Sequence, residues 1–230
     1  MKIPSKALVF VVLAAGLARG AADSDTRPSV EPLTVGERIE AGNEITVERL
    51  SNGMTVIVRP TRQAPVVCVR AYVHAGGLYE GPWLGCGISH LTEHLVAKGA
   101  AHDMGEGLTA GEAKQTSGRV EQIGGQSNAF TSLDETCYYI SAAAGRAQEC
   151  IDLIADWLAR AQIAEEDFRR EHGVVQRELE MGKDEPTRQL WYAHSANFFR
   201  DHPAGIPVIG LAAPLAKLTL ADVLEYHRRA

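Results

Sequence analysis

Two imidazoles and a carboxylate stand at helical spacing in the segment His90-Leu91-Thr92-Glu93-His94. On a helix, which turns about 100° per residue, His90 and His94 lie one turn apart on one face, and Glu93 lies roughly 60° from His90. Two imidazoles placed in this way can hold a zinc ion, while the adjacent carboxylate can take a proton from a water on that ion. Histidines four residues apart also occur on solvated helix faces, so this segment alone does not establish a metal site.

A second segment, residues 165–182, carries carboxylates that could complete such a site, because catalytic zinc usually has three protein ligands. Glu171 and Glu178, two helical turns apart, project into an apolar face made of Phe168, Val174, Val175, Leu179 and Met181. A carboxylate directed at a core is costly unless it is paired or bound to a metal. Both can pair with Arg or Lys at the rim of the core, or one can bind zinc while the other orients a ligand or a water. The histidine motif favours the second alternative.

The elements that must position these side chains follow from periodicity and turn residues. Residues 45–50 and 54–59 predict two strands joined by a turn at Ser51-Asn52-Gly53, and a strand with alternating apolar residues follows at 66–74. Further predicted strands cover 127–132 and 136–142, and predicted helices cover 87–98, 111–123, 146–161, 165–182, 187–200 and 219–229. This order predicts an α+β fold with a largely antiparallel sheet packed with helices.

The first 22 residues have the pattern of a cleaved export signal. Lys2 and Lys6 precede an apolar run over residues 7–18, which is shorter than the roughly 20 residues that span a bilayer. Small residues allow cleavage after Gly20 or after Ala22, and a membrane anchor or a buried N-terminal helix is the alternative interpretation. We therefore expect a periplasmic or secreted protein without a stable membrane span. Residues 23–44 are interpreted as a linker, and residues 45–230 as the functional domain.

Composition narrows the possible partners and the redox chemistry. The net charge of −6 without a block of Lys or Arg argues against nucleic acid as a partner, and loss of the leader, which holds three cations and no acid, makes the charge −9. An oxidising compartment permits disulfides, but four cysteines allow three pairings, and buried free thiols are equally ordinary. These cysteines are Cys68, Cys86, Cys137 and Cys150.

Four segments in order resemble the M16 metallopeptidases, the group that contains pitrilysin, insulin-degrading enzyme and the mitochondrial processing peptidase. The matching segments are residues 50–58, 87–94 with 98–99, 124–131 with 136–139, and 171–178 with 184–186, and the pattern continues at 202–203, 207–210 and 218–219. The resemblance spans about residues 45–230.

The resemblance implies a zinc-dependent endopeptidase that hydrolyses peptides or unfolded protein segments. One Zn²⁺ per chain would be bound by His90, His94 and Glu178, with Glu93 as the general base and Glu171 as a supporting carboxylate.

The resemblance also implies a substrate-binding strand and a missing partner. The segment Asn128-Ala129-Phe130 would be an edge strand that receives the peptide substrate by β-addition. Family members carry more strands after this point and then a second, related domain, so a second domain or a partner subunit is expected to supply the remainder, and the 230-residue chain alone is expected to cleave poorly. The alternative is a non-catalytic peptide-binding or assembly subunit, which would bind no zinc.

Overall fold

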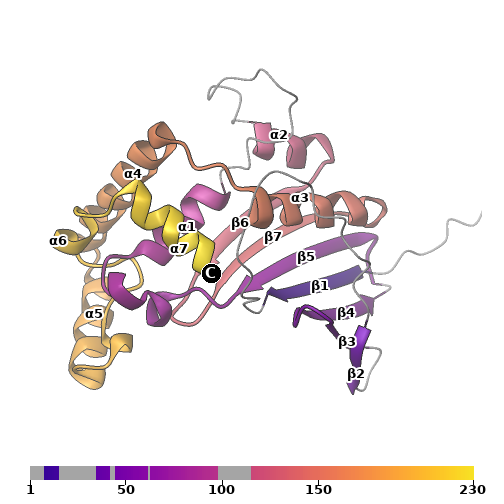
Figure 1. Ribbon diagram of the computed structural model, residues 1–230, viewed down its shortest axis with the longest axis horizontal. Coiled ribbons are helices and arrows are strands. Elements are labelled where there is room, and N and C mark those ends of the chain that lie inside the picture. The colour runs from indigo at the N-terminus through magenta and orange to yellow at the C-terminus, as the bar shows by residue number, and fades with distance from the viewer. Residues whose placement is uncertain (1–7, 16–34, 42–44, 62, 98–114) are drawn as a thin grey trace, which may run out of the picture.

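The computed structural model describes residues 8–15, 35–41, 45–61, 63–97 and 115–230. Its centre is a seven-stranded sheet in the order β2-β3-β4-β1-β5-β7-β6, with most of the helices gathered beyond one end of it (Figure 1). The strands are β1 (Leu8–Ala15), β2 (Val35–Ala41), β3 (Ile45–Leu50), β4 (Thr55–Thr61), β5 (Val66–Val73), β6 (Gln126–Thr131) and β7 (Thr136–Ala143). Of the strand pairs described, β1 with β5 is parallel and the others are antiparallel, which confirms the predicted fold class.

The helices match the predicted positions within a few residues, except that the short helix α6 was not predicted. They are α1 (Ile88–Ala97), α2 (Gln115–Gln122), α3 (Ala147–Arg160), α4 (Glu165–Lys183), α5 (Pro186–Phe199), α6 (Ala212–Leu215) and α7 (Leu220–Arg229). Single 3-10 turns occupy Gly77–Tyr79, Gly81–Trp83, Ala144–Arg146 and Pro203–Gly205. The predicted turn between β3 and β4 is present, with Gly53 at φ +88° and the Leu50 amide donating to the carbonyl of Met54.

Two strands lie in segments that the sequence did not assign to the sheet. Leu8–Ala15, the apolar part of the predicted export signal, forms β1, and Val35–Ala41, inside the predicted linker, forms β2. A run such as Leu-Val-Phe-Val-Val-Leu is as suitable for a central strand as for the apolar part of a leader, because both require an uninterrupted apolar sequence. Export and cleavage of residues 1–22 therefore stay predictions.

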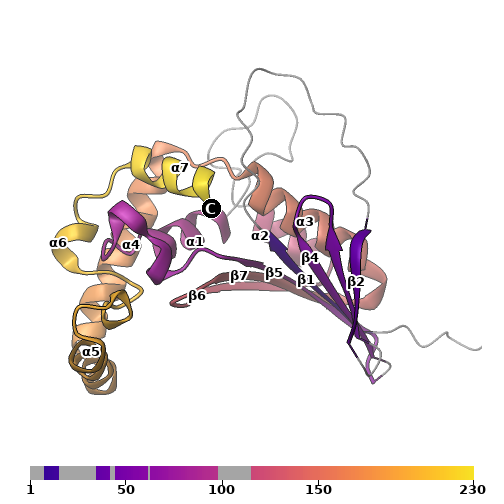
Figure 2. The ribbon, with the colours of Figure 1, turned by 60° about the horizontal axis from the view of Figure 1, so that its bottom comes forward.

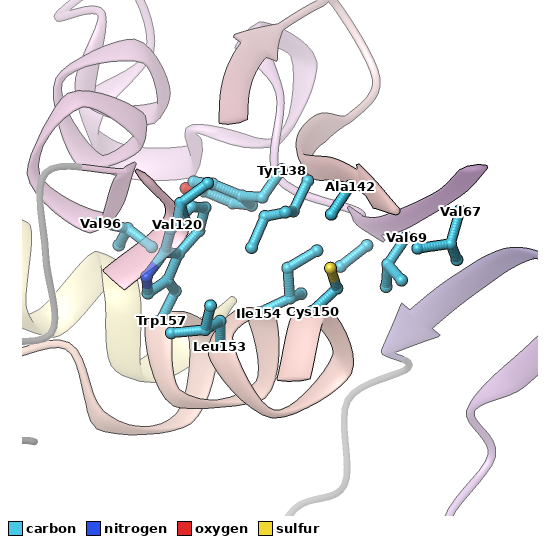
Figure 3. Packing of buried hydrophobic residues seen from close by; sticks show 12 residues of the cluster. Val67, Val69, Val96, Val120, Tyr138, Ala142, Cys150, Leu153, Ile154 and Trp157 are labelled. Carbon is cyan, nitrogen blue, oxygen red and sulfur yellow. The ribbon is translucent and has the colours of Figure 1, made fainter. Parts of the chain in front are cut away.

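Two apolar cores hold the fold together. One lies between the sheet and α3 and includes Val69 and Ala142 of the sheet with Ile154 and Trp157 of α3 (Figure 3). The other joins α1, α4, α6 and α7 through residues that include Leu91, Val175, Leu215 and Val223. Figure 2 shows α3 over one face of the curved sheet and the second group of helices at the sheet's end, beside β6. Helix α1 contacts both groups, so the histidine motif lies where the two cores meet.

Two further findings concern the cysteines and the helices of the described residues. All four cysteines lie there, and each has a free thiol. No helix in the described ranges is long and apolar enough to cross a membrane.

Candidate metal centre

Helix α1 is held by burial of its apolar side chains. Ile88 and Leu91 are fully buried and Leu95 is 5% exposed. The intervening His90 and His94 remain partly exposed, and their ring centroids lie 4.7 Å apart. The 3.6-residue period thus fixes both imidazoles on one side of a helix whose other side is packed into the core.

A buried carboxylate that the sequence analysis missed, Glu80, holds the start of α1. Glu80 is 2% exposed and accepts hydrogen bonds from the Gly85 amide at 3.1 Å, the Ser89 amide at 3.1 Å and the Ser89 hydroxyl at 2.8 Å. The Ser89 amide is one of the free donors of the first helical turn, so Glu80 satisfies it and places a negative charge near the helix N-terminus. No local pattern reveals this role, because Glu80 lies outside the helix and reaches it only in the fold.

Two glycines allow a close backbone contact at the same place. Gly87 has φ +67°, and a Cβ there would lie 2.2 Å from the carbonyl oxygen of Ile209. Gly210 has φ +86°, and a Cβ there would lie 2.6 Å from the amide nitrogen of Gly87. The Leu211 amide also donates to the Gly85 carbonyl at 2.9 Å. The loop before α6 therefore fixes the beginning of the histidine helix, which only glycine permits at this distance.

Helix α4 brings two glutamates to α1 in different environments. Its inner face buries Phe168 and Val175, and the Glu171 side chain between them is 1% exposed. The Glu178 side chain is 40% exposed and lies at the edge of the face. Met181 is 67% exposed, so the predicted apolar face ends before that residue. Both glutamates face the histidines, but only Glu171 is buried in the core.

Three side chains from α1 and α4 converge into one possible ligand set. Glu178 Oε2 lies 3.9 Å from His90 Nε2 and 3.7 Å from His94 Nε2, and one atom from each of the three residues lies within 4.8 Å of the others. Zinc bonds of about 2.0–2.2 Å in a tetrahedron require ligand atoms about 3.4 Å apart. The separations between these ligand atoms are larger than that value. His90, His94 and Glu178 therefore fit a zinc ion after side-chain adjustments that bring the atoms closer together.

Glu171 contacts one of these candidate ligands, His94, at its ring nitrogen Nδ1. Its Oε2 lies 3.4 Å from His94 Nδ1, and its Oε1 accepts from Arg170 Nε at 3.2 Å. A histidine that donates from Nδ1 to a carboxylate keeps the Nε2 lone pair for a metal, and Nε2 is the atom that faces Glu178. Glu171 therefore does what each of the two sequence-based alternatives required of it. It pairs with a cation, Arg170, and it also orients His94.

The charge state of the His90 imidazole also suits metal binding. Burial, with a smaller contribution from His94, lowers the pKa of His90 to about 4. The imidazole is therefore neutral at neutral pH, which is the form that ligates metals. Its Nδ1 is buried and has no hydrogen-bond partner among the described groups, so His90 lacks the support that Glu171 gives to His94.

Glu93 lies beside the ligand set without belonging to it. The residue is 8% exposed, and its Oε2 accepts a hydrogen bond of 2.8 Å from the Thr131 hydroxyl of β6. Burial raises the pKa of the Glu93 carboxyl, while the Thr131 hydrogen bond and His94 oppose that rise. A carboxylate with a raised pKa next to a metal site can accept a proton from water more readily than an ordinary one.

The predicted substrate-binding residues lie on β6, which ends the sheet among the described strands. A pocket of about 240 Å³ joins this strand to the candidate metal centre, and it is lined by Glu93, His94, Ala97, Ser127, Asn128, Ala129 and Trp157. Phe130 is absent from the lining; its ring packs edge-on against Tyr72, 6.5 Å away. The structure thus brings Asn128 and Ala129 to the site and directs Phe130 elsewhere, and peptide binding by these residues stays a prediction.

Comparison with known proteins gives a consistent family assignment. Residues 55–211 match the sequence profile of Insulinase (Peptidase family M16). An uncharacterized zinc protease of Rickettsia felis is 27% identical over 180 residues, which are 78% of this chain and 42% of the relative. An uncharacterized zinc protease of Mycobacterium bovis is 30% identical over 184 residues, which are 78% of this chain and 39% of the relative. The chain therefore spans about two fifths of the length of these curated relatives.

Solved structures agree with the sequence relatives. A protease from Helicobacter pylori superposes with a TM-score of 0.64 at 25% identity, covering 83% of this chain and 42% of that one. An inactive peptidase M16 domain from Pseudomonas fluorescens superposes with a TM-score of 0.62 at 18% identity, covering 73% of this chain and 39% of that one. At this identity the similarity concerns the fold alone. The profile match covers more than half of the chain, and it includes the histidine motif, Glu171 and Glu178. The chain therefore belongs to peptidase family M16, as the four motifs had predicted.

Proposed function

We propose that this chain is the zinc-binding part of an endopeptidase that hydrolyses peptides or unfolded protein segments in the periplasm or outside the cell. The observation that carries the proposal is the convergence of His90 and His94 from α1 with Glu178 from α4, around one point and beside the buried Glu93. The names of the sequence relatives, which describe zinc proteases, support zinc as the metal.

In the proposed mechanism, zinc, when bound, supplies Lewis acidity that polarises the scissile carbonyl and lowers the pKa of a water. His90, His94 and Glu178 hold the metal, and Glu171 keeps His94 in the tautomer that can ligate it. Glu93 accepts the proton of the attacking water and later passes it to the leaving amine. The Thr131 hydroxyl fixes the Glu93 carboxylate in place by donating to its Oε2.

The substrate is proposed to lie along β6 in an extended conformation, adding a strand to the sheet edge. The pocket beside Ala129 connects that edge with Glu93, so a side chain close to the scissile bond can enter it. Because the chain spans about two fifths of its relatives' length, we propose that a second M16-like domain or subunit completes the substrate chamber.

A non-catalytic peptide-binding or assembly subunit is the second candidate. An inactive M16 domain has a similar fold, so the fold by itself does not imply catalysis, whereas the presence of all three candidate ligands and of Glu93 favours the peptidase.

The variant Glu93→Gln in the full-length protein decides between these functions. We expect zinc to be retained at one ion per chain and peptide hydrolysis to fall by about 10²–10⁴-fold, the usual contribution of a general base. Glu166→Gln, at an exposed position on α4, is the matched control and should leave both quantities unchanged. Full hydrolysis in Glu93→Gln would refute the mechanism, and a wild-type protein that takes up no zinc would favour the non-catalytic subunit.

A further inference from the structure

Arg170 of α4 contacts two carboxylates of the same helix. Its Nη2 donates a hydrogen bond to Asp167 Oδ1, and its Nε donates to Glu171 Oε1 at 3.2 Å. The second oxygen of Glu171, Oε2, lies 3.4 Å from His94 Nδ1. The two oxygens of the Glu171 carboxylate therefore have different partners, and a continuous line of contacts leads from Asp167 to a candidate zinc ligand on α1.

The burial of these side chains makes the contact between Arg170 and Glu171 different from an ordinary surface ion pair. The Arg170 side chain is 52% exposed, whereas the Glu171 side chain is 1% exposed. Two exposed partners would gain little from pairing, because water solvates each of them well. A carboxylate that is almost fully buried has lost that water, so its oxygens need donors from the protein. Arg170 supplies such a donor to Oε1, while its own charge stays in contact with solvent.

The orientation of the Arg170 side chain is not the one that helical spacing favours. Consecutive residues of a helix point about 100° apart, so their side chains do not face each other. Arg170 nevertheless reaches Glu171, and Asp167, three residues earlier, holds the guanidinium at its other end. A guanidinium presents its donors in a rigid planar fork, which bridges two carboxylates better than the compact ammonium group of a lysine does. This bridge restricts the rotation of the Glu171 carboxylate.

The preceding residue, Arg169, has the same charge but a different environment. Its Nε donates to Glu165 Oε1 at 3.0 Å, and its side chain is 75% exposed. No hydrogen bond or ion pair among the described residues joins Arg169 to α1. Each of the two arginines thus pairs with an acid in the first turn of α4, but of the two, Arg170 alone also contacts the carboxylate that meets His94.

We propose that Arg170 is a positioning residue of the metal centre, which fixes the Glu171 carboxylate so that its Oε2 meets His94 Nδ1. With Oε1 bound to Arg170, the carboxylate cannot turn away from His94 without losing a buried ion pair. The His94 Nδ1 hydrogen then stays directed at Glu171, and Nε2 is presented toward Glu178, 3.7 Å away. This inference rests on the proposed zinc function, and Arg170 acts through Glu171 without touching the metal or the substrate.

The zinc affinity of the full-length protein, measured by competition with a chromogenic chelator, tests the assignment. In Arg170→Met, which removes the donors, we expect the affinity to fall by about 3–10-fold, less than the loss of a group that supports a ligand directly. The matched control Arg169→Met removes the same charge and a neighbouring ion pair, and it should change the affinity by less than about twofold. In a Glu171→Gln background, adding Arg170→Met should also have an effect below about twofold, because Arg170 acts through that carboxylate.

Nitrogen NMR of the metal-free full-length protein with isotope-labelled histidine gives a readout that needs neither zinc nor peptidase activity. At one fixed pH, we expect the neutral His94 imidazole of the wild type and of Arg169→Met to carry its hydrogen mainly on Nδ1. In Arg170→Met, the form with the hydrogen on Nε2 should become detectable, because the released Glu171 carboxylate no longer holds the Nδ1 hydrogen in place. A merely structural ion pair would change the melting temperature and leave this tautomer ratio as it is.

Either an unchanged zinc affinity or an unchanged tautomer ratio in Arg170→Met would overturn the inference. Equal changes in Arg169→Met would overturn it as well, and so would a loss in the Glu171→Gln background as large as the loss in the wild-type background. A wild-type protein that takes up no zinc would contradict the proposed function, and the tautomer ratio would then decide the role of Arg170 alone. Because half of the Arg170 side chain is exposed, the variant is expected to fold, and Arg170→Gln is the second variant should the melting temperature of Arg170→Met be too low.

Discussion

Glu171 Oε2 lies 3.4 Å from His94 Nδ1, which couples a buried carboxylate of α4 to a candidate zinc ligand of α1. The contact joins residues 77 positions apart in the chain. It fixes which nitrogen of His94 can meet a metal, because the nitrogen that donates to Glu171 cannot also ligate. Helix α4 thus contributes a candidate ligand, Glu178, and the side chain that contacts another candidate ligand, His94.

Substitution of Glu171 should weaken zinc binding without removing a ligand. Glu171→Gln keeps the shape but loses the charge that polarises His94, so we expect zinc affinity to fall by about 10–100-fold, the usual effect of such supporting groups. Competition with a chromogenic chelator measures this change, and Glu166→Gln on the exposed side of α4 is the control. Unchanged affinity in Glu171→Gln would mean that the contact with His94 does not tune the metal site.

The close approach of Gly87 to the loop before α6 should be intolerant of any side chain. Gly87→Ala places a Cβ 2.2 Å from the Ile209 carbonyl oxygen at a positive φ, so the backbone must shift. We expect the free energy of unfolding to fall by at least about 2 kcal/mol and the zinc content to drop, because His90 follows three residues later. Urea denaturation and metal analysis measure the two effects.

Gly145→Ala is the matched control for this position, since a Cβ there meets nothing within 4 Å and the residue has no positive φ. Equal stability of Gly87→Ala and Gly145→Ala would contradict the assigned role of the close contact.

Glu80 should make stability depend on pH in a defined direction. Burial raises the pKa of its carboxyl, so the folded protein holds this proton more tightly than the unfolded chain does. The contribution of Glu80 to the free energy of unfolding therefore falls as the pH rises from the unfolded pKa of about 4.3 through the raised folded value. In Glu80→Gln this decline should disappear, because the amide does not titrate there.

The same variant should be less stable than wild type overall. Glu80 accepts three hydrogen bonds, and the amide nitrogen of a glutamine cannot accept, so at least one buried donor loses its partner at a cost of about 1–3 kcal/mol. Thermal and urea unfolding over pH 4–8, with the exposed Glu121→Gln as control, separates the two effects. A parallel pH profile for Glu80→Gln and wild type would exclude Glu80 as the titrating group.

Removal of residues 1–22 from the 230-residue chain should destabilise the isolated piece. Without β1, the backbone groups of β4 and β5 that face it lose their partners, and exposed strand edges promote association. We expect a lower melting temperature and a larger apparent size by light scattering for residues 23–230 than for residues 1–230. Identical behaviour of the two chains would show that β1 contributes nothing to the sheet.

The sequence by itself determined the family, the candidate site residues and most of the elements. The spacing of His90, Glu93 and His94 specifies a helix face on which the two imidazoles are neighbours, because the helical period is local. The same holds for Glu171 and Glu178 on α4, and for the turn at Asn52-Gly53. The family motifs lie within these local patterns, so the M16 assignment needed no tertiary contact.

Only the tertiary structure decided how these pieces meet. The role of Glu80 at the start of α1, the contact between Gly87 and Gly210, and the distinction between buried Glu171 and half-exposed Glu178 all depend on packing between segments that are distant in the chain. The place of Leu8–Ala15 is the sharpest case, because an apolar run suits both a leader and a central strand, and strand pairing is a non-local interaction that no period in the sequence encodes.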